Sequence, residues 1–499
     1  MFCWFRHVRA SVFAVPAFLA AINPAFAAPG DLDAAGFGAG TGKILTAIGP
    51  AYDRAAGIAL QPDGKIIVAG PCRNDNNDDF CVARYLPGGA LDTSFNGTGT
   101  ALAAIGASDD IATAVALQPD GKVVVAGYCF NGGRYDFCVS RHLTTGAIDT
   151  SFDGTGRVMT TIGTAYSMAL TLMLQPDGKI VVAGVCSNGG NNDFCLARYL
   201  TSGALDTSFN GTGKVLTPIG LSDDTANAIA LQSDGRIVVA GFCLGGGADF
   251  CLARYMTDGT LDTTFGSTGK TFTSFGASDD NVYSIALQPD GKIVVAGECR
   301  SGGSADFCLA RYQRDGALDP SFNGTGKLKS AISAGDDVAS ALALQPDGKI
   351  VVAGLCHNGS NYDFCLARYL ASGVLDTSFG SAGTTITPVG TSQDHGRALA
   401  LQPDGKIVVA GACNNGSRTD FCLTRHEGGP FDARNCSMDI DGDNRVLATT
   451  DSLIHARIAL GMTGPAVIDG ITFASHAARQ TWADIRNYLV TQCGMSLVQ

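Results

Sequence analysis

Residues 226–281 read ANAIALQSDGRIVVAGFCLGGGADFCLARYMTDGTLDTTFGSTGKTFTSFGASDDN, and close copies of this unit recur along most of the chain. The first cysteine of each copy marks the period. These cysteines are Cys72, Cys129, Cys186, Cys243, Cys299, Cys356 and Cys413, at successive steps of 57, 57, 57, 56, 57 and 57 residues. A fixed period of this length is typical of a repeat architecture, in which each copy forms one structural unit.

Each copy contains four short segments with the composition of β-strands. The first segment, as in residues 57–61 (GIALQ), leads through Pro-Asp-Gly at 62–64 to the second segment, residues 65–70 (KIIVAG). Pro-Asp-Gly suits a tight turn, because glycine readily adopts the positive φ that such a turn needs. The third segment is exemplified by residues 79–86 (DFCVARYL), and the shorter, more polar fourth segment by residues 213–220 (GKVLTPIG).

The middle segments of each copy are apolar on both faces, as in KIVVAG, whereas a strand with one face in water alternates between apolar and polar residues. Both faces of these small sheets must therefore be covered by protein. Short strands in small sheets that are covered on both sides fit the blades of a β-propeller, which pack face to face around an axis. The sequence thus predicts an all-β propeller.

The two ends of the repeat region complement each other. Residues 31–48 match the stretch that leads into and through the fourth segment, while the last copy, residues 397–426, supplies only the first three. A solenoid would instead need atypical, polar capping repeats at its ends. We therefore predict a closed ring of seven blades over residues 31–430, in which the strand at 43–48 pairs with the strand at 420–426 and completes the last blade.

Three motifs carry a resemblance to a known family. LQPDGKIVVAG (174–184), DFCLARY (193–199) and LDTSFNGTGK (205–214) resemble the delta-60 repeat family of bacterial proteins. The resemblance covers roughly residues 31–430 and implies a seven-bladed propeller, but it implies no activity. The cysteine pair departs from the family pattern, because those two positions usually carry small residues other than cysteine.

The two cysteines of each copy flank a turn between the second and third segments, so a hairpin places them opposite each other. A disulfide across so short a loop stabilises the hairpin by about 2–3 kcal/mol. A zinc site would need about four ligands, and only one of the turns adds a histidine, His357. The predicted disulfides are Cys72–Cys81, Cys129–Cys138, Cys186–Cys195, Cys243–Cys251, Cys299–Cys308, Cys356–Cys365 and Cys413–Cys422.

The cysteine-flanked turns are the variable part of the repeat. The turns that emerge on the other face of a propeller, QPDGK and LDTSFNGTG, are nearly identical in every copy, whereas the cysteine-flanked tips differ. Varied loops on a rigid scaffold often carry binding function, although tips rich in Asn and Gly also suit plain solvated turns. The candidate ligand-binding residues on these tips are Arg73, Arg134, Tyr135, Arg300, His357, Tyr362 and Arg418.

Two further repeated features have simpler interpretations. The SDD turns carry carboxylates on the same face as the variable tips. These carboxylates could form a cation site or, more simply, stabilise the turns. The residues are Asp109, Asp110, Asp223, Asp224, Asp279 and Asp280. The repeated arginine of ARY is expected to pair with an aspartate of its own copy. These arginines are Arg84, Arg198, Arg254, Arg311 and Arg368.

The N-terminus has the order of a secretory signal peptide. Arg6 and Arg9 precede an apolar run, and small residues flank Phe26, so we expect cleavage after Ala27 and a signal peptide over residues 1–27. The apolar run is too short for a membrane span, which needs about 20 residues. An exported chain with an even number of remaining cysteines favours disulfides. We expect a secreted or periplasmic protein without a membrane span after cleavage.

The formal net charge of −12 at pH 7 becomes more negative once Arg6 and Arg9 leave with the signal peptide. DNA and RNA are polyanions, and no basic, aromatic-rich stripe offsets the repulsion. Nucleic acid is therefore not an expected partner, and we expect a monomer.

After Arg434 the repeat ends, and residues 451–462 and 477–493 have a helical pattern. DIDGDN before the first helix resembles a single dockerin-type calcium loop, although its last acidic ligand stands one position late. The resemblance implies a helical module over residues 434–499 that binds calcium, with a plain acidic turn as the alternative. The implied ligands are Asp439, Asp441, Asp443, Arg445 (through its carbonyl) and Asp451. Cys436 and Cys493 bracket the module, and we expect a disulfide between them to tie its ends.

The sequence contains no nucleophile elbow, HExxH motif or P-loop. We therefore expect a non-enzymatic binding or adhesion scaffold that recognises an extracellular glycan or protein through its disulfide-stapled loop face. The alternative is a hydrolase or lyase that acts on polysaccharides in the central channel. A carboxylate pair or a His/Arg cluster near the axis would favour the alternative, and varied rim loops without one would favour the scaffold.

Overall fold

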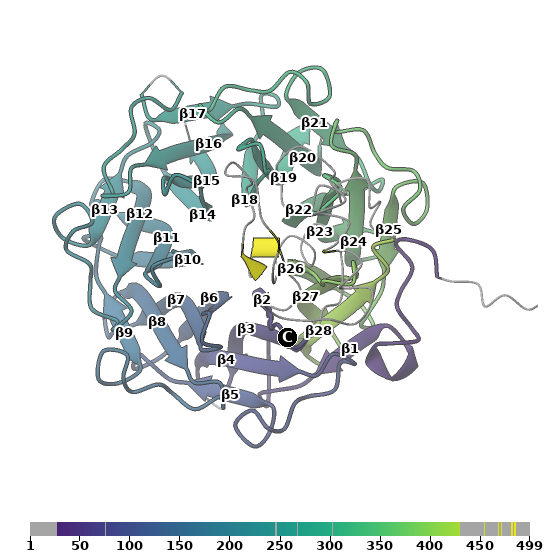
Figure 1. Ribbon diagram of the computed structural model, residues 1–499, viewed down its shortest axis with the longest axis horizontal. Helices are drawn as coiled ribbons and strands as arrows, with labels where there is room; N and C mark the ends of the chain where they lie inside the picture. The colour runs from purple at the N-terminus through teal and green to yellow at the C-terminus, as the bar shows by residue number, and fades with distance from the viewer. Residues whose placement is uncertain are drawn as a thin grey trace, which may run out of the picture.

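A computed structural model shows seven four-stranded antiparallel sheets arranged as blades around one axis (Figure 1). The structure describes residues 27–429, apart from residues 75, 245–246, 267 and 302, together with seven single residues between 454 and 485. The seven-bladed all-β propeller predicted from the repeat is thus confirmed. The predicted signal peptide, apart from Ala27, lies outside the described residues, and so does almost all of the predicted helical module.

Each blade runs from an innermost strand at the axis to an outermost strand at the perimeter. The innermost strands are β2 (Gly57–Leu60), β6 (Asp110–Leu117), β10 (Ser167–Leu174), β14 (Asp224–Leu231), β18 (Asp280–Leu287), β22 (Asp337–Leu344) and β26 (Asp394–Leu401). The second strands are β3 (Ile66–Arg73), β7 (Val123–Phe130), β11 (Ile180–Ser187), β15 (Ile237–Leu244), β19 (Ile293–Ser301), β23 (Ile350–His357) and β27 (Ile407–Asn414).

The third and fourth strands complete the blades. The third strands are β4 (Asp78–Tyr85), β8 (Tyr135–His142), β12 (Asn192–Tyr199), β16 (Ala248–Tyr255), β20 (Ser304–Tyr312), β24 (Tyr362–Tyr369) and β28 (Thr419–His426). The outermost strands are β5 (Thr100–Ala103), β9 (Arg157–Thr160), β13 (Lys214–Thr217), β17 (Lys270–Thr273), β21 (Lys327–Ser330), β25 (Thr384–Thr387) and β1 (Lys43–Thr46). A 3-10 turn, η1 (Gly38–Gly40), precedes β1.

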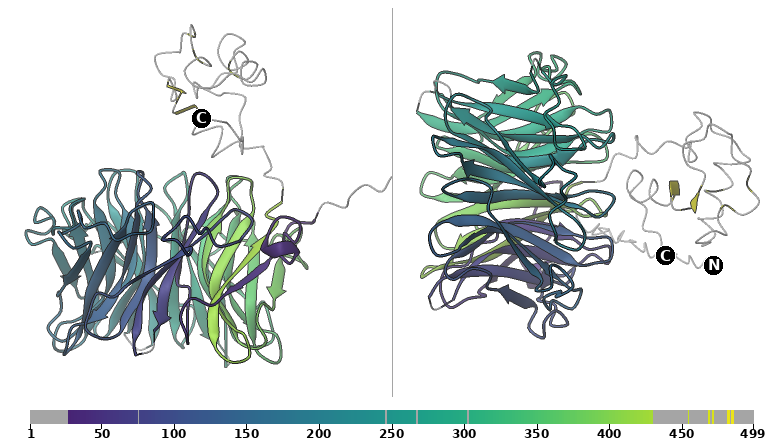
Figure 2. Two further views of the ribbon diagram at one scale, coloured as in Figure 1. Left: turned by 90° about the horizontal axis from the view of Figure 1, so that it is seen from below. Right: turned by 90° about the vertical axis from the view of Figure 1, so that its left-hand side faces the viewer.

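The hydrophobic core is divided among the junctions between blades. One cluster joins Val124 and Phe137 of one blade to Ile180 and Val182 of the next, all of them fully buried. This arrangement explains why the second and third strands are apolar on both faces, since each face packs against a different neighbour. Seen from the side, the ring is a disc whose connecting loops emerge on two opposite faces (Figure 2).

The N-terminal strand closes the ring as predicted. β1 pairs antiparallel with β28 and supplies the outermost strand of the last blade. The contact continues upstream, because Leu32 forms an isolated bridge with His426. Val408 and Phe421 of the last blade pack in one cluster with Ile66 and Val68 of the first. The ring is therefore held shut by both backbone pairing and a shared core.

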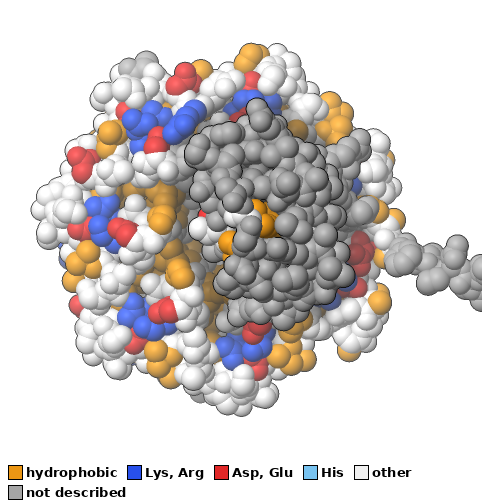
Figure 3. All heavy atoms as spheres, viewed as in Figure 1, with side chains coloured by type: hydrophobic (Ala, Val, Ile, Leu, Met, Phe, Trp, Pro, Cys, Tyr) orange, Lys and Arg blue, Asp and Glu red, His pale blue; other side chains and the backbone are white. Residues whose placement is uncertain are grey.

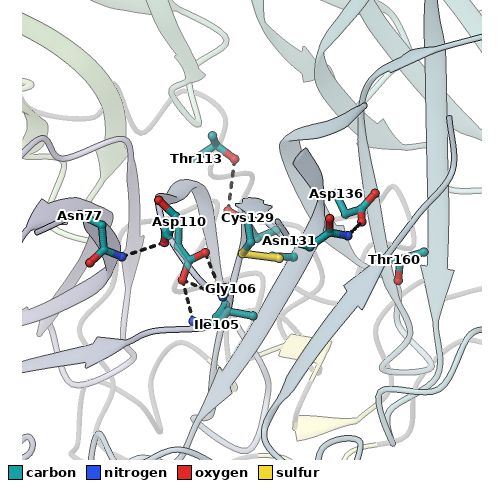
Figure 4. The surroundings of a disulfide bond; sticks show 12 residues. Asn77, Ile105, Gly106, Asp110, Thr113, Cys129, Asn131, Asp136 and Thr160 are labelled. Atoms are coloured by element: carbon teal, nitrogen blue, oxygen red, sulfur yellow. Dashed lines mark hydrogen bonds between the residues drawn. A yellow bond between two sulfur atoms is a disulfide. The ribbon is translucent and has the colours of Figure 1, made fainter. Parts of the chain in front are cut away.

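All seven predicted hairpin disulfides are present, each linking the second and third strands of one blade. We call the face that carries these hairpins the stapled face. Figure 4 shows one of them: the Cys129 disulfide lies near Asp110, whose carboxylate accepts hydrogen bonds from the backbone N–H groups of Ile105 (2.6 Å) and Gly106. Asp224 and Asp280 hold the equivalent turns in their blades.

The first aspartate of each SDD turn has a different task. Asp109, Asp223 and Asp279 each accept a hydrogen bond from a backbone N–H group at the start of the preceding blade's third strand, over 2.9–3.1 Å. Both aspartates of these turns therefore serve as turn and hairpin caps, in agreement with the simpler of the two sequence interpretations.

The opposite face, which we call the latch face, repeats one set of contacts around the ring. Arg198 pairs with Asp206 at 2.8 Å, stacks over Phe209 at 4.4 Å and donates to the carbonyl of Thr257 in the next blade at 2.5 Å. Equivalent pairs occur in the other blades, which confirms the predicted pairing of the ARY arginine. Figure 3 shows basic and acidic side chains gathered in repeated clusters around one face.

The last latch depends on the N-terminal segment. Arg425 pairs with Asp33 at 2.8 Å, stacks over Phe37 at 4.6 Å and donates to the carbonyl of Pro87 in the first blade at 2.5 Å. Lys406 reaches the same Asp33 carboxylate at 2.6 Å. Residues 31–46 thus supply both the missing strand and the missing half of this latch. Within the described part of the chain, no helix has the length and apolarity required to cross a membrane.

Candidate functional site

Six of the seven innermost strands share a bulge at one position of the repeat, and Ala56 stands at the equivalent position directly before β2. In the pairing of β6 with β7 the register jumps from Ala112 to Ala114, which leaves Thr113 unpaired. A bulge re-aims the side chain of the extra residue. The same shift occurs in β10, β14, β18, β22 and β26. The residues at this position are Ala56, Thr113, Leu170, Asn227, Tyr283, Ser340 and Arg397, which we call the bulge ring.

All seven residues of the bulge ring line one pocket of about 400 Å³ on the axis of the propeller. Val338 and Leu355 complete its wall. Leu355 directly precedes Cys356 of a stapled hairpin, so the pocket extends from the bulge ring toward the stapled face. A volume of this size falls within the range of about 300–1,000 Å³ that small-molecule sites occupy.

The bulge ring carries seven different side chains on a frame that is otherwise repeated. Two of them fasten neighbouring blades. The Thr113 hydroxyl donates to the Ala169 carbonyl of the next blade at 3.0 Å, with the Ala126 carbonyl of its own blade 3.2 Å away, and the Asn227 amide donates to the Val282 carbonyl at 2.7 Å. The other five side chains of the bulge ring can vary without destabilising the propeller, because none of them belongs to the hydrophobic cores of the blades.

Tyr283 belongs to a polar network beside the pocket. Its hydroxyl donates to the Glu298 carboxylate at 2.9 Å, and the Asn281 amide donates to the same oxygen at 3.1 Å. Arg300 lies 3.8 Å from the other oxygen of Glu298. Burial and the nearby negative charge of Glu298 raise the pKa of Tyr283. The phenol therefore stays protonated at neutral pH, and the Glu298 charge is satisfied within the protein.

Arg397 differs from the arginines of the latch face, which are ion-paired. Its side chain reaches the solvent in the pocket, yet protein surrounds it, and it makes no hydrogen bond or ion pair with any residue that the structure describes. Burial and the positive charge of Arg54 lower its pKa. Arginine stays protonated in proteins nonetheless, so the pocket contains a positive charge without an internal counter-ion.

The candidate tip residues lie at the ends of the stapled hairpins. The structure brings His357 and Tyr362 together as an edge-to-face pair 5.3 Å apart, and Tyr362 also contacts His395, 6.1 Å away. The Tyr362 hydroxyl donates to Asp336 at 3.2 Å. Tyr135 packs edge-to-face against Phe130 at 5.4 Å. These aromatic groups form parts of the rim on separate blades.

The candidate arginines of the tips have partners close by. Arg73 lies 3.5 Å from Asp78 on its own hairpin, Arg134 lies 3.3 Å from Asp136, and Arg418 lies 3.1 Å from Asp420. Arg134 and Arg418 also reach the chain before the next blade, through Thr161 Oγ1 and the Pro50 carbonyl. These arginines brace the hairpins, and a role in ligand binding remains a prediction.

The tip prediction missed the bulge ring, although the repeat contains a signal for it. In the segments AAGIAL, ATAVAL, ALTLML, ANAIAL, VYSIAL, ASALAL and GRALAL, the second residue changes its chemistry from copy to copy. Its neighbours stay small or apolar. A varying position inside a strand that is otherwise repeated suggests a side chain outside the core, but only the register shift shows that it faces the axis.

The predicted calcium ligands and the predicted Cys436–Cys493 disulfide lie outside the described residues. Within the part of the chain that the structure describes, no group of three or more His, Cys, Asp or Glu side chains is placed to hold a metal ion. The calcium loop therefore remains a prediction from the sequence.

The fold and its repeats define this chain as a seven-bladed repeat β-propeller with a disulfide in every blade. Seven segments match the model of a family described as a domain of unknown function (DUF5122), beta-propeller; they are residues 61–95, 118–152, 175–209, 232–265, 288–322, 345–379 and 402–425. These segments run from the turn after the innermost strand to the latch face. No curated protein sequence is significantly similar to the chain.

Several solved structures are similar to this chain at low sequence identity. Virginiamycin B lyase from Staphylococcus aureus is 12% identical with a TM-score of 0.45, and the match covers 77% of this chain and 98% of that one. An ulvan lyase of polysaccharide lyase family PL25 is 10% identical with a TM-score of 0.43, covering 76% and 94%. The periplasmic gluconolactonase of Pseudomonas aeruginosa is 14% identical with a TM-score of 0.44, covering 68% and 87%.

Proposed function

We propose that this chain is a non-enzymatic binding scaffold outside the cytoplasm, whose stapled face binds an extracellular glycan or protein. The observation that carries the proposal is the bulge ring, where seven different side chains line one axial pocket on an otherwise repeated frame. Binding residues commonly sit on a scaffold that is rigid and uniform elsewhere. Seven disulfides in the hairpins support a secreted or periplasmic location, since disulfides persist in oxidising compartments.

The experiment compares two bulky substitutions on a glycan array. Ser340→Trp fills the axial pocket, whereas Ser202→Trp places the same ring on an exposed loop of the latch face. We expect the wild-type protein and Ser202→Trp to bind the same glycans and Ser340→Trp to lose them. Equal binding by both variants would show that the pocket is not the binding site. The absence of any binding glycan would remove the glycan half of the proposal.

A polysaccharide-acting lyase is the second candidate, because His395, Arg397 and Tyr283 lie near the axis. Burial, with a smaller contribution from the charge of Arg397, lowers the pKa of His395, so its imidazole is neutral at pH 7 and able to accept a proton. Tyr283 is less suited as a base, because its pKa is raised. Incubation with uronate polysaccharides, followed by ultraviolet absorbance of an unsaturated product, tests this candidate, with His395→Gln as the variant expected to lose activity.

A further inference from the structure

The guanidinium group of Arg397 has no hydrogen-bond or ion-pair partner among the described residues. A guanidinium group offers five N–H donors and no acceptor. In the arginines of the latch face each guanidinium nitrogen has a partner: Arg198, for example, contacts a carboxylate, a hydroxyl and a carbonyl. The tip arginines Arg134 and Arg418 are also paired. Arg397 alone among these is aimed into an open pocket with its donors unused.

Among the residues that the structure describes, no carboxylate is placed to neutralise Arg397. Arg54 is the charged group whose field reaches it, and that field is positive. Arg54 itself lies 3.7 Å from Asp78 on its own blade. The buried carboxylate of Glu298 is already occupied by Tyr283, Asn281 and Arg300. The pocket therefore presents a net positive site in a protein whose overall charge is −12.

The rest of the wall is largely apolar. Leu170, Val338, Leu355 and Ala56 line the pocket, with Ser340, Thr113 and Asn227 between them. A saturated sugar ring has apolar C–H faces and polar edges, so it can pack against such a wall while an edge group meets the cation. Arginine recognises carboxylate and sulfate oxygens with paired, charge-assisted hydrogen bonds. These properties complement an acidic sugar better than a neutral one.

We infer that the axial pocket binds an anionic sugar unit, with Arg397 contacting its carboxylate or sulfate group. This inference rests on the proposed binding function of the stapled face and names the ligand class. The charged group enters from the stapled face, toward which the pocket extends, and the sugar ring lies against Leu170, Val338 and Leu355. Salt weakens the interaction, because ions screen the attraction between exposed charges.

Titration calorimetry of the full mature chain with three defined probes tests the inference. Oligogalacturonate supplies carboxylates, dextran sulfate supplies sulfates, and dextran is the neutral reference. We expect one of the two anionic probes to bind and dextran not to bind. Arg397→Gln should weaken that binding by about 10- to 100-fold, the equivalent of a charged hydrogen bond lost, and Arg397→Lys should weaken it less.

Arg314→Gln is the matched control, since it removes the same charge from the exposed latch face, where Arg314 pairs with Asp234 at 2.7 Å. Its affinity should equal that of the wild-type protein. Circular dichroism should show both variants folded, because Arg397 holds no structural contact. Equal affinities for Arg397→Gln and Arg314→Gln would overturn the role of Arg397.

The outcomes separate this inference from the proposed function. One outcome is that only neutral glycans bind, that Ser340→Trp abolishes this binding and that Arg397→Gln retains it. This outcome would contradict the anionic-sugar inference and support the proposed binding function. If neither anionic probe binds but a polyglutamate peptide does, with the same dependence on Arg397, the ligand is an acidic protein segment and the sugar assignment is wrong. If none of these probes binds, the anionic-sugar inference is wrong, and the glycan array then decides separately whether the glycan half of the proposed function stands.

Discussion

The two faces of this propeller treat their carboxylates in opposite ways. On the latch face, burial alone would raise the pKa of Asp206, but hydrogen bonds from Ser208 and Lys179 and the charge of Arg198 outweigh it and lower the pKa to about 2. On the stapled face, burial and the charges of Asp249 and Asp279 raise the pKa of Asp280 to about 6, against the hydrogen bond from Phe275. Ionisation of Asp206 on the latch face therefore stabilises the fold, whereas ionisation of Asp280 on the stapled face destabilises it.

This difference between the two faces distinguishes the structural contacts of the latch from the side chains of the bulge ring. The latch repeats one set of contacts in every blade, so its residues are nearly identical from copy to copy. The bulge ring repeats only a backbone irregularity and carries a different side chain each time. Uncompensated charge and sequence variation are thus concentrated toward the stapled face. This contrast predicts that substitutions on the two faces differ in both size and kind of effect.

The largest effect is expected where the latch and the ring closure coincide. Deletion of residues 28–46 removes β1 and also Asp33, which leaves the buried Arg425 without its carboxylate. Breaking a buried pair alone costs about 3–5 kcal/mol, and the open edge of β28 invites association. We expect aggregation and a strongly lowered melting temperature, measured by size-exclusion chromatography and calorimetry. A monomer that melts with the wild-type protein would contradict the closure.

A single latch can be broken inside the ring. Asp206→Ala should cost about 3–5 kcal/mol, because it leaves the buried Arg198 unpaired. Asp177→Ala is the control: its side chain is 54% exposed and pairs only with Lys179, so the expected change is below about 1 kcal/mol. Thermal unfolding of both variants checks the difference. Similar melting temperatures for the two would show that the latch does not hold the blades together.

Removal of a staple should have an intermediate effect. Cys186→Ala combined with Cys195→Ala opens one hairpin on the stapled face, and the chain-entropy argument gives a loss of about 2–3 kcal/mol. The remaining hydrogen bonds between β11 and β12 keep the hairpin paired. The melting temperature should fall while the circular dichroism spectrum is unchanged. A loss of β-structure in this variant would mean that the staple is required for folding and not only for stability.

Much of the fold follows from the sequence, because local signals and the period agree. The Pro-Asp-Gly turns, the apolar middle strands and the complementary chain ends predict the blades and their closure, and the paired cysteines predict the hairpin disulfides. The axial site could not be predicted in the same way. Which side chain of an innermost strand faces the axis depends on the register shift between strands such as β6 and β7, and that shift has no local sequence signal beyond variability.

The smallest expected effect concerns the free-energy cost of ionising the buried Asp280 carboxyl on the stapled face. The Asp280 carboxyl has a folded pKa raised from 3.8 to about 6, so its contribution to stability is fully present below about pH 3.8 and is lost as the pH rises through 6. Asp280→Asn imitates the protonated form: its amide oxygen can accept the Phe275 N–H, and its NH₂ group replaces an oxygen that has no partner.

We therefore expect Asp280→Asn to raise the melting temperature at pH 7.5, by the equivalent of about 1 kcal/mol, and to leave it nearly unchanged at pH 3.5, below the unfolded pKa of 3.8. Asp206→Asn on the latch face should show the opposite dependence, because the stability from a lowered pKa is present above about pH 3.8 and lost only as the pH falls toward 2. Melting curves of both variants at the two pH values measure this. If Asp280→Asn destabilises the protein at pH 7.5, the stapled face does not carry the charge cost that distinguishes it from the latch face.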